Sequence, residues 1–198
     1  MSVDVRGACA LYYSYQIRGS DGRINVPFRR KTAHSFLIGY ARWLYLKMGS
    51  VADQSITDTG AVSRTVLSSA AIDTETVAGT STEGLVVGTG TNAVALADTK
   101  LQTQIAHGVG SGQLDYGASV VNLPSSDATS TTLICTRVFA NSSGASITIR
   151  EIGIYSSMLI TGGIDGNQVQ ICIVRDLATI ALSNGDQLTL NYIFKTTS

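Results

Sequence analysis

Two short stretches of the 198-residue chain have the residue types and spacing that catalytic or cofactor sites use. Asp58-Thr59-Gly60 matches the triplet with which aspartic proteases hold a carboxylate at a tight turn, so that two such groups share a proton. The chain has one such triplet, and polar residues rather than an apolar strand precede it. Gly88–Ala93 matches a G-x-G-x-x-A dinucleotide pattern, but no helix or βαβ unit is predicted after it. Both stretches are therefore interpreted as turns.

The cysteines and histidines give no sign of a metal or a catalytic group. Cys9, Cys135 and Cys172 lie far apart, and His34 and His107 each stand alone, whereas structural zinc needs closely spaced ligands. Two of the cysteines interrupt apolar, strand-like runs, so we expect core thiols in a chain folded in a reducing cytoplasm. We expect no catalytic residue, no metal, no cofactor and no enzymatic activity.

Composition and charge limit the class of protein further. The chain is 44% apolar and only 14% charged, which excludes a disordered chain, and no run approaches the roughly 18 apolar residues of a membrane span. Neither a membrane partner nor a secretory signal is predicted. Residues 1–50 hold eight basic and two acidic residues, a net charge of +6, and the remainder balances it at −6. This asymmetry fits either head-to-tail association of copies or two solvated surfaces of one fold.

One helix is predicted, over Thr32–Met48. Leu37, Ala41, Leu44 and Met48 form a stripe at helical spacing. Aromatic residues widen this stripe until little of the circumference is polar, so the helix must be covered on several sides. A neighbouring subunit would supply that cover easily.

The stretch that follows, residues 50–83, is rich in Ser, Thr, Ala and Asp and has little periodicity. It predicts a long loop or extended arm, with a short strand at Ser63–Leu67, and segments of this length usually contact a partner or carry function. Asp98 is expected to cap a brief helix with Leu101 and Ile105 on one face.

Alternation of apolar and polar residues predicts strands at both ends of the chain. Period-two alternation is typical of antiparallel sheets with one packed face, and the intervening Gly, Asn and Asp residues predict turns. The expected strands are Ala10–Ile17, Ile24–Phe28, Gly84–Val87, Leu133–Phe139, Ser146–Tyr155, Gln168–Arg175 and Gln187–Phe194. The fold class is therefore mainly β, an antiparallel jelly-roll-like β-sandwich with one apolar helix and a long arm. We expect an anchoring region at residues 1–83 and a sandwich domain at 84–198.

Three groups of short motifs resemble a pattern found in structural proteins of tailed bacteriophages. The first is Gly84–Thr91 with Ala97–Leu101 and His107-Gly108. The second is Arg137–Gly144 with Ile147–Tyr155, which is similar to an "F-x-N-x-S-G … I-x-E-I-G-L-Y" segment, although Ile154 stands where Leu is usual. The third comprises Val174-Arg175-Asp176, Ile180 and Asn184–Tyr192.

The resemblance implies a virion protein, made in the host cytoplasm, that works by assembly and without catalytic residues. It decorates or cements the capsid in the leading interpretation, and is a tail or fibre component, with receptor or glycan contacts through loops such as Gly108–Gly112, in the alternative. The aspartic-protease interpretation ranks below both. The expected partners are other copies of the chain and capsid or tail proteins, with no nucleic acid, because the basic run at 29–31 is short and has no interleaved aromatic residue. The candidate assembly residues are Arg29, Arg30, Lys31, Phe36, Leu37, Tyr40, Trp43 and Leu44.

Overall fold

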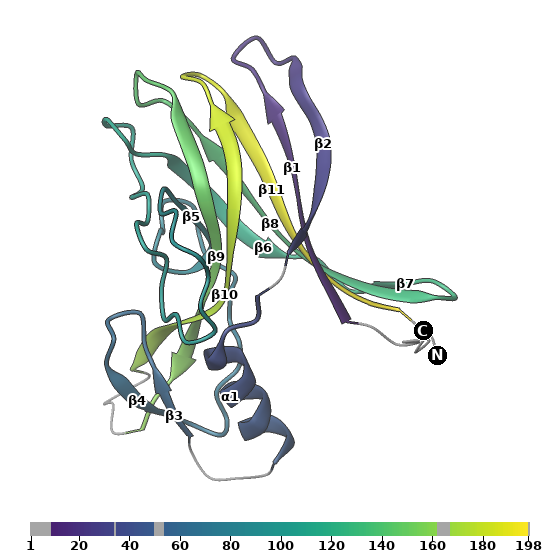
Figure 1. Ribbon diagram of the computed structural model, residues 1–198, viewed down its shortest axis with the longest axis vertical. Coiled ribbons are helices and arrows are strands. Elements are labelled where there is room, and N and C mark those ends of the chain that lie inside the picture. Colours follow the sequence, from purple (N-terminus) through teal and green to yellow (C-terminus); the bar gives the residue numbers. More distant parts are fainter. Residues whose placement is uncertain (1–8, 34, 50–53, 162–166, 198) are drawn as a thin grey trace.

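The computed structural model describes residues 9–33, 35–49, 54–161 and 167–197, and its architecture is mainly β (Figure 1). All pairs of strands named in this part of the chain run antiparallel. In chain order the elements are β1 (Cys9–Arg18), β2 (Ile24–Ala33), α1 (Ile38–Met48), β3 (Gln54–Thr57), β4 (Ser63–Val66), β5 (Gly84–Gly88), β6 (Asp115–Val121), β7 (Ser125–Ser126), β8 (Ser130–Ala140), β9 (Ile147–Leu159), β10 (Gln168–Leu182) and β11 (Gln187–Thr197). All seven expected strands are confirmed, as β1, β2, β5, β8, β9, β10 and β11.

The larger sheet has the strand order β2-β1-β11-β8-β6, with β7 pairing β8. Tyr192 of β11 lies between Tyr13 of β1 and Cys135 of β8, and all three are buried. The predicted alternation of β11 is also confirmed, because Leu188, Leu190 and Tyr192 are fully buried. The sheet thus joins strands from the two ends of the chain, and it crosses the boundary expected near residue 83.

The smaller sheet has the order β10-β9-β5 and packs against the larger one, so that both contribute to one apolar core (Figure 1). β5 is the last strand of this sheet, and it is buried along its whole length. The ends of β8 and β11, together with β7, run out beyond this packed region as an arm. The arm leaves part of the larger sheet without a second layer over it.

The helix begins six residues later than predicted. Thr32 and Ala33 continue β2 by pairing with Tyr12 and Leu11 of β1, and Leu37 is still extended, with φ −82° and ψ 167°. The predicted stripe is not the packed face either: Leu37 is buried, but Leu44 and Met48 are 37% and 76% exposed. Because the helix packs on β10 and β3 through Gly39 and Leu46, its apolar stripe faces outward.

Residues 54–83, part of the expected long loop or extended segment, contain more structure than predicted. β3 and β4 form a hairpin, in which β4 confirms the short strand expected at Ser63–Leu67. Asp73 and Thr76 form isolated bridges to Ser157 and Ser119. The brief helix expected after Asp98 is absent from the described structure; that carboxylate instead accepts a hydrogen bond from the amide of Ala95 and binds Arg175. Residues 50–53 and His34 lie outside the described residues.

Candidate assembly surface

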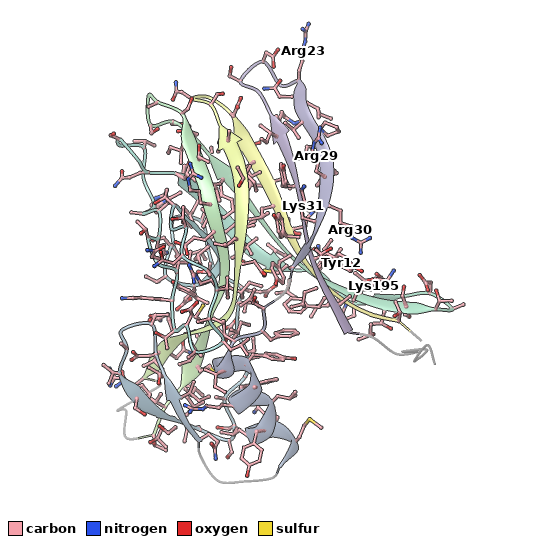
Figure 2. All side chains as sticks on the ribbon, in the orientation of Figure 1. Tyr12, Arg23, Arg29, Arg30, Lys31 and Lys195 are labelled. Atoms are coloured by element: carbon pink, nitrogen blue, oxygen red, sulfur yellow. The ribbon has the colours of Figure 1, made fainter. Side chains whose placement is uncertain are left out.

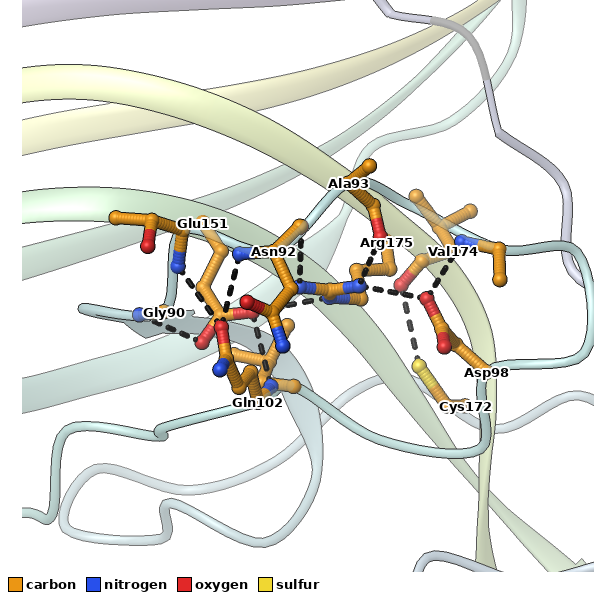
Figure 3. Close-up of polar contacts among 12 residues, drawn as sticks. Gly90, Asn92, Ala93, Asp98, Gln102, Glu151, Cys172, Val174 and Arg175 are labelled. Atoms are coloured by element: carbon orange, nitrogen blue, oxygen red, sulfur yellow. Dashed lines mark hydrogen bonds and ion pairs between the residues drawn. The ribbon is translucent and has the colours of Figure 1, made fainter.

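One stretch from each of the three motif groups contributes to a buried ion network on the β9–β10 face (Figure 3). Glu151 of β9 is fully buried, and Arg175 of β10 donates from Nε to its Oε2 at 3.0 Å. Arg175 also donates from Nη1 to Asp98 at 2.6 Å and from Nη2 to the carbonyl of Asn92 at 3.1 Å. Burial alone would lower the pKa of Arg175, but the two carboxylates outweigh it and raise that pKa. The three side chains form a cluster in which each buried polar group has a hydrogen-bond partner.

Glu151 also fixes the two loops above it. The backbone amides of Gly90 and Thr103 donate to Oε1 at 3.0 and 2.7 Å, and the amide of Gln102 donates to Oε2 at 2.9 Å. A Cβ added at Gly90 would lie 2.4 Å from Oε1, so only glycine fits there. The Gly88–Ala93 stretch, which matches a dinucleotide pattern, therefore forms a turn that packs against the carboxylate of Glu151.

Packing of Leu101 against Gly153 and Tyr155 of β9 holds the same loop in place. Leu101 donates its amide to the hydroxyl of Tyr155 at 2.8 Å, and its side chain occupies the space left by Gly153, where an added Cβ would lie 2.8 Å from Cδ2. A glycine inside a strand commonly marks such a close approach.

Arg137 holds a second loop against β8. It is fully buried, stacks over Tyr116 at 4.8 Å from the ring centroid, and forms no ion pair within the described residues. Its guanidinium donates to the carbonyls of Gly117, Glu83, Leu85 and Thr80. Burial lowers the pKa of Arg137 to about 10, which leaves it protonated at neutral pH.

The two Asn-containing turns at the far end of the sheets bind each other. Asn141 is fully buried and donates from Nδ2 to the carbonyls of Ala145 and Leu182, while the side chain of Asn184 accepts from the amide of Gly144. The motif residues thus perform structural tasks in each of the three groups.

Asp58 sits in the turn of the β3–β4 hairpin. Its Oδ1 accepts from the amide of Val62 at 2.9 Å and its Oδ2 from Nε of Arg64 at 2.8 Å. Burial alone would raise the pKa of Asp58, but these hydrogen bonds and the charge of Arg64 lower it. Both oxygens are engaged within the hairpin, so the triplet acts here as a turn.

An apolar groove opens between α1 and the sheet surface at the base of the arm. Three rings on the helix side form a stacked row: Phe36 lies 4.1 Å from Tyr40 between centroids, and Tyr40 lies 6.0 Å from Trp43. Phe194 of β11 stacks on Phe36 from the opposite wall at 5.8 Å. The groove has a volume of about 400 Å³, and its other lining residues are Ile72, Thr74, Val121, Leu133, Cys135, Ile154, Ile173 and Thr196.

The helix continues this apolar surface toward solvent. Ile38, Leu44, Tyr45 and Met48 are all exposed, at 41%, 37%, 56% and 76%. Singly exposed apolar residues are common, but four on one eleven-residue helix beside an apolar groove form a contiguous patch, which is typical of interaction sites.

The basic run belongs to a different element. Arg29, Arg30 and Lys31 are exposed on β2, the edge strand of the larger sheet, and Arg30 stacks over Tyr12 at 3.8 Å from its ring centroid (Figure 2). Lys195 on β11 and Arg23 in the preceding turn add to the positive charge on this side. The run is therefore a charged edge, not a continuation of the helix patch.

The structure thus divides the eight predicted assembly residues. It brings Phe36, Tyr40 and Trp43 together in the groove and exposes Leu44 beside them, but Leu37 is 1% exposed. Including Leu37 was wrong for a surface contact, because its side chain belongs to the core. Leu133 and Phe194, on the opposite wall, were missed because they become neighbours of the helix only through long-range packing.

The remaining predicted groups are not assembled into another site. Cys135 and Cys172 are buried and free, and burial raises the pKa of both thiols. Within the described ranges no group of three or more His, Cys, Asp or Glu side chains could hold a metal ion, and no helix is long and apolar enough to cross a membrane. Comparison with family models, curated proteins and solved structures found no match.

Proposed function

We propose that this chain is a non-enzymatic structural protein of a tailed-bacteriophage virion that decorates or cements the capsid. The observation that carries the proposal is the open apolar patch of α1 and its groove. Burying such a surface against a capsid protein is favourable by about 25 cal/mol per Å² before the costs of association. Repetition over many symmetric copies makes a weak single contact effective.

The motif network supports assigning the chain to this class. The stretches that resemble phage structural proteins fix its loops and turns through Glu151, Arg137 and Asn141. Residues that hold loops and turns in place help to determine a fold. The resemblance in these motifs therefore supports a fold shared with the phage structural proteins. We assign that fold to the jelly-roll-like sandwich class, with two antiparallel sheets on one core as support.

A tail or fibre component is the alternative, and the loop at 108–112 favours it. Val109 at its tip is 64% exposed, and the side chain of Gln113 accepts from the amide of Gly110, which holds the loop in shape. A preformed, exposed loop suits contact with a receptor or glycan.

The position of the protein on the particle tests the proposal. We expect cryo-electron microscopy of particles that carry this protein to find it on the shell, and particles lacking it to lose resistance to heat and low salt. Density at the tail, with unchanged shell stability, would favour the alternative and contradict decoration.

Two matched variants connect that test to the surface. Met48→Lys puts a charge on the α1 patch, and Val109→Lys makes the same change at an exposed loop. Decoration predicts that Met48→Lys weakens particle binding at least tenfold while Val109→Lys leaves it unchanged. The reverse pattern would support the fibre interpretation.

A further inference from the structure

The larger sheet ends at β2 in an edge that carries positive charge on both faces. Arg29 and Lys31 lie opposite Tyr15 and Tyr13 of β1, and Arg30 lies opposite Ser14, so successive cations point to opposite faces. None of the three forms an ion pair with a carboxylate of the described residues. Ile24 and Phe28 on the same strand are 50% and 55% exposed.

The opposite margin of the same sheet has the complementary charge. β6 is the last strand there, and two exposed carboxylates lie on β6 or on the segment that bridges to it, namely Asp115 and Glu75. Glu75 accepts from the amide of Val121 at 3.0 Å, and Asp115 lies 3.6 Å from His107. Exposed apolar side chains accompany them, namely Val77, Val120 and Leu123.

Two copies cannot join through identical edges without repulsion. A twofold pairing of β2 with β2 would set cations against cations, and charged side chains together with Pro27 are devices that block such pairing. A β2 edge set against the β6 margin of another copy instead brings cations to carboxylates and apolar residues to apolar residues.

We infer that the β2 edge of one copy binds the β6 margin of a second copy, head to tail. This inference rests on the proposed assembly function, because it names the chain itself as one partner. Each copy offers one edge of each kind, so the contact closes into a ring or continues as an open chain, depending on the rotation between copies.

The contact depends on side chains rather than on a continuous sheet. Backbone groups on the outer edge of β6 are already hydrogen-bonded to the segment beside it. Thr76 and Ser119 exchange two backbone hydrogen bonds, and the amide of Gly79 donates to the carbonyl of Tyr116. Exposed ion pairs are individually weak and are screened by salt. Association should therefore be strong only at low ionic strength or among many copies.

Charge reversal in the full chain tests the contact by sedimentation velocity. The unchanged protein should associate at about 0.01 M salt and become monomeric at about 1 M, as the Debye length falls from about 30 to about 3 Å. Arg29→Glu with Lys31→Glu, and separately Glu75→Lys with Asp115→Lys, should each leave a monomer at low salt. An equimolar mixture of the two variants should associate again, because each then carries the charge that the other lacks.

A matched control separates the edge from net charge. Lys100→Glu with Arg150→Glu makes the same change in charge at exposed positions away from both margins, and it should leave association intact. The inference is overturned if this control dissociates as completely as the β2 variant, if the mixture stays monomeric, or if the unchanged protein is monomeric at low salt. Association only after adding an oligonucleotide would also overturn it, by assigning the edge to an anionic polymer. The particle test above acts on α1, so its result is independent of this one.

Discussion

At the scale of single residues, the charged side chains that matter most are the buried ones. Glu151, Arg175 and Arg137 are 0%, 2% and 0% exposed, yet in the sequence they look like ordinary charged residues of strands. Period-two alternation predicts that a charged residue of a strand faces solvent. These residues are buried instead, because loops fold over β9 and β8. This is why nothing in the sequence indicated that these three residues are buried and hold loops.

Glu151→Gln should destabilise the fold strongly. Glutamine keeps only one of the two oxygens and has an NH2 group in place of the other. In one orientation this NH2 group faces the amides of Gly90 and Thr103, and in the other it faces the amide of Gln102 and Nε of Arg175. Either way, hydrogen-bond donors face donors. Breaking a buried ion pair from one side typically costs about 3–5 kcal/mol. Urea denaturation followed by circular dichroism measures the change in the free energy of unfolding.

The same substitution at Glu75 is the control for this prediction. Glu75 is exposed and accepts one hydrogen bond, which an amide oxygen also accepts, so the free energy of unfolding should change by less than about 0.5 kcal/mol. Equal effects at the two positions would contradict the structural task given to Glu151.

At the scale of elements, strands were easier to predict than the helix, for a physical reason. The alternation of β11 survives because one face packs, whereas both faces of β10 are covered near Cys172 and Ile173. Ile173 lines the groove between α1 and the larger sheet, and the loop that carries Asp98 and Leu101 lies over the face of Cys172. The helix itself was placed too early, because pairing with β1 keeps Thr32 and Ala33 in a strand. Long-range contacts of this kind leave no local signal in the sequence.

Gly39→Ala should loosen the helix although alanine is the better helix former. Its added Cβ would lie 2.9 Å from the carbonyl oxygen of Cys172 and 2.9 Å from Cγ2 of Ile171, so α1 must move away from β10. The propensity gain of about 1 kcal/mol opposes this clash. We expect a net loss of stability and a red shift in the emission of Trp43, the chain's one tryptophan.

Ala41→Gly provides the comparison on the exposed side of the same helix. It should cost about 1 kcal/mol through propensity alone and leave the emission of Trp43 in place. A Gly39→Ala protein that is more stable than the parent would show that α1 is not seated against β10 as described.

At the scale of the whole molecule, the larger sheet joins strands from both sides of the predicted boundary near residue 83. β11 pairs along its whole length with β1, from Cys9 opposite Thr196 to Arg18 opposite Gln187. A fragment of residues 84–198 would therefore expose one edge of β11 and lose the helix that covers β10. It should lack a near-ultraviolet circular dichroism signal and a cooperative thermal transition, and mixing it with a fragment of residues 1–83 should restore both. A fragment 84–198 that unfolds cooperatively by itself would instead establish the predicted sandwich domain as an independent unit.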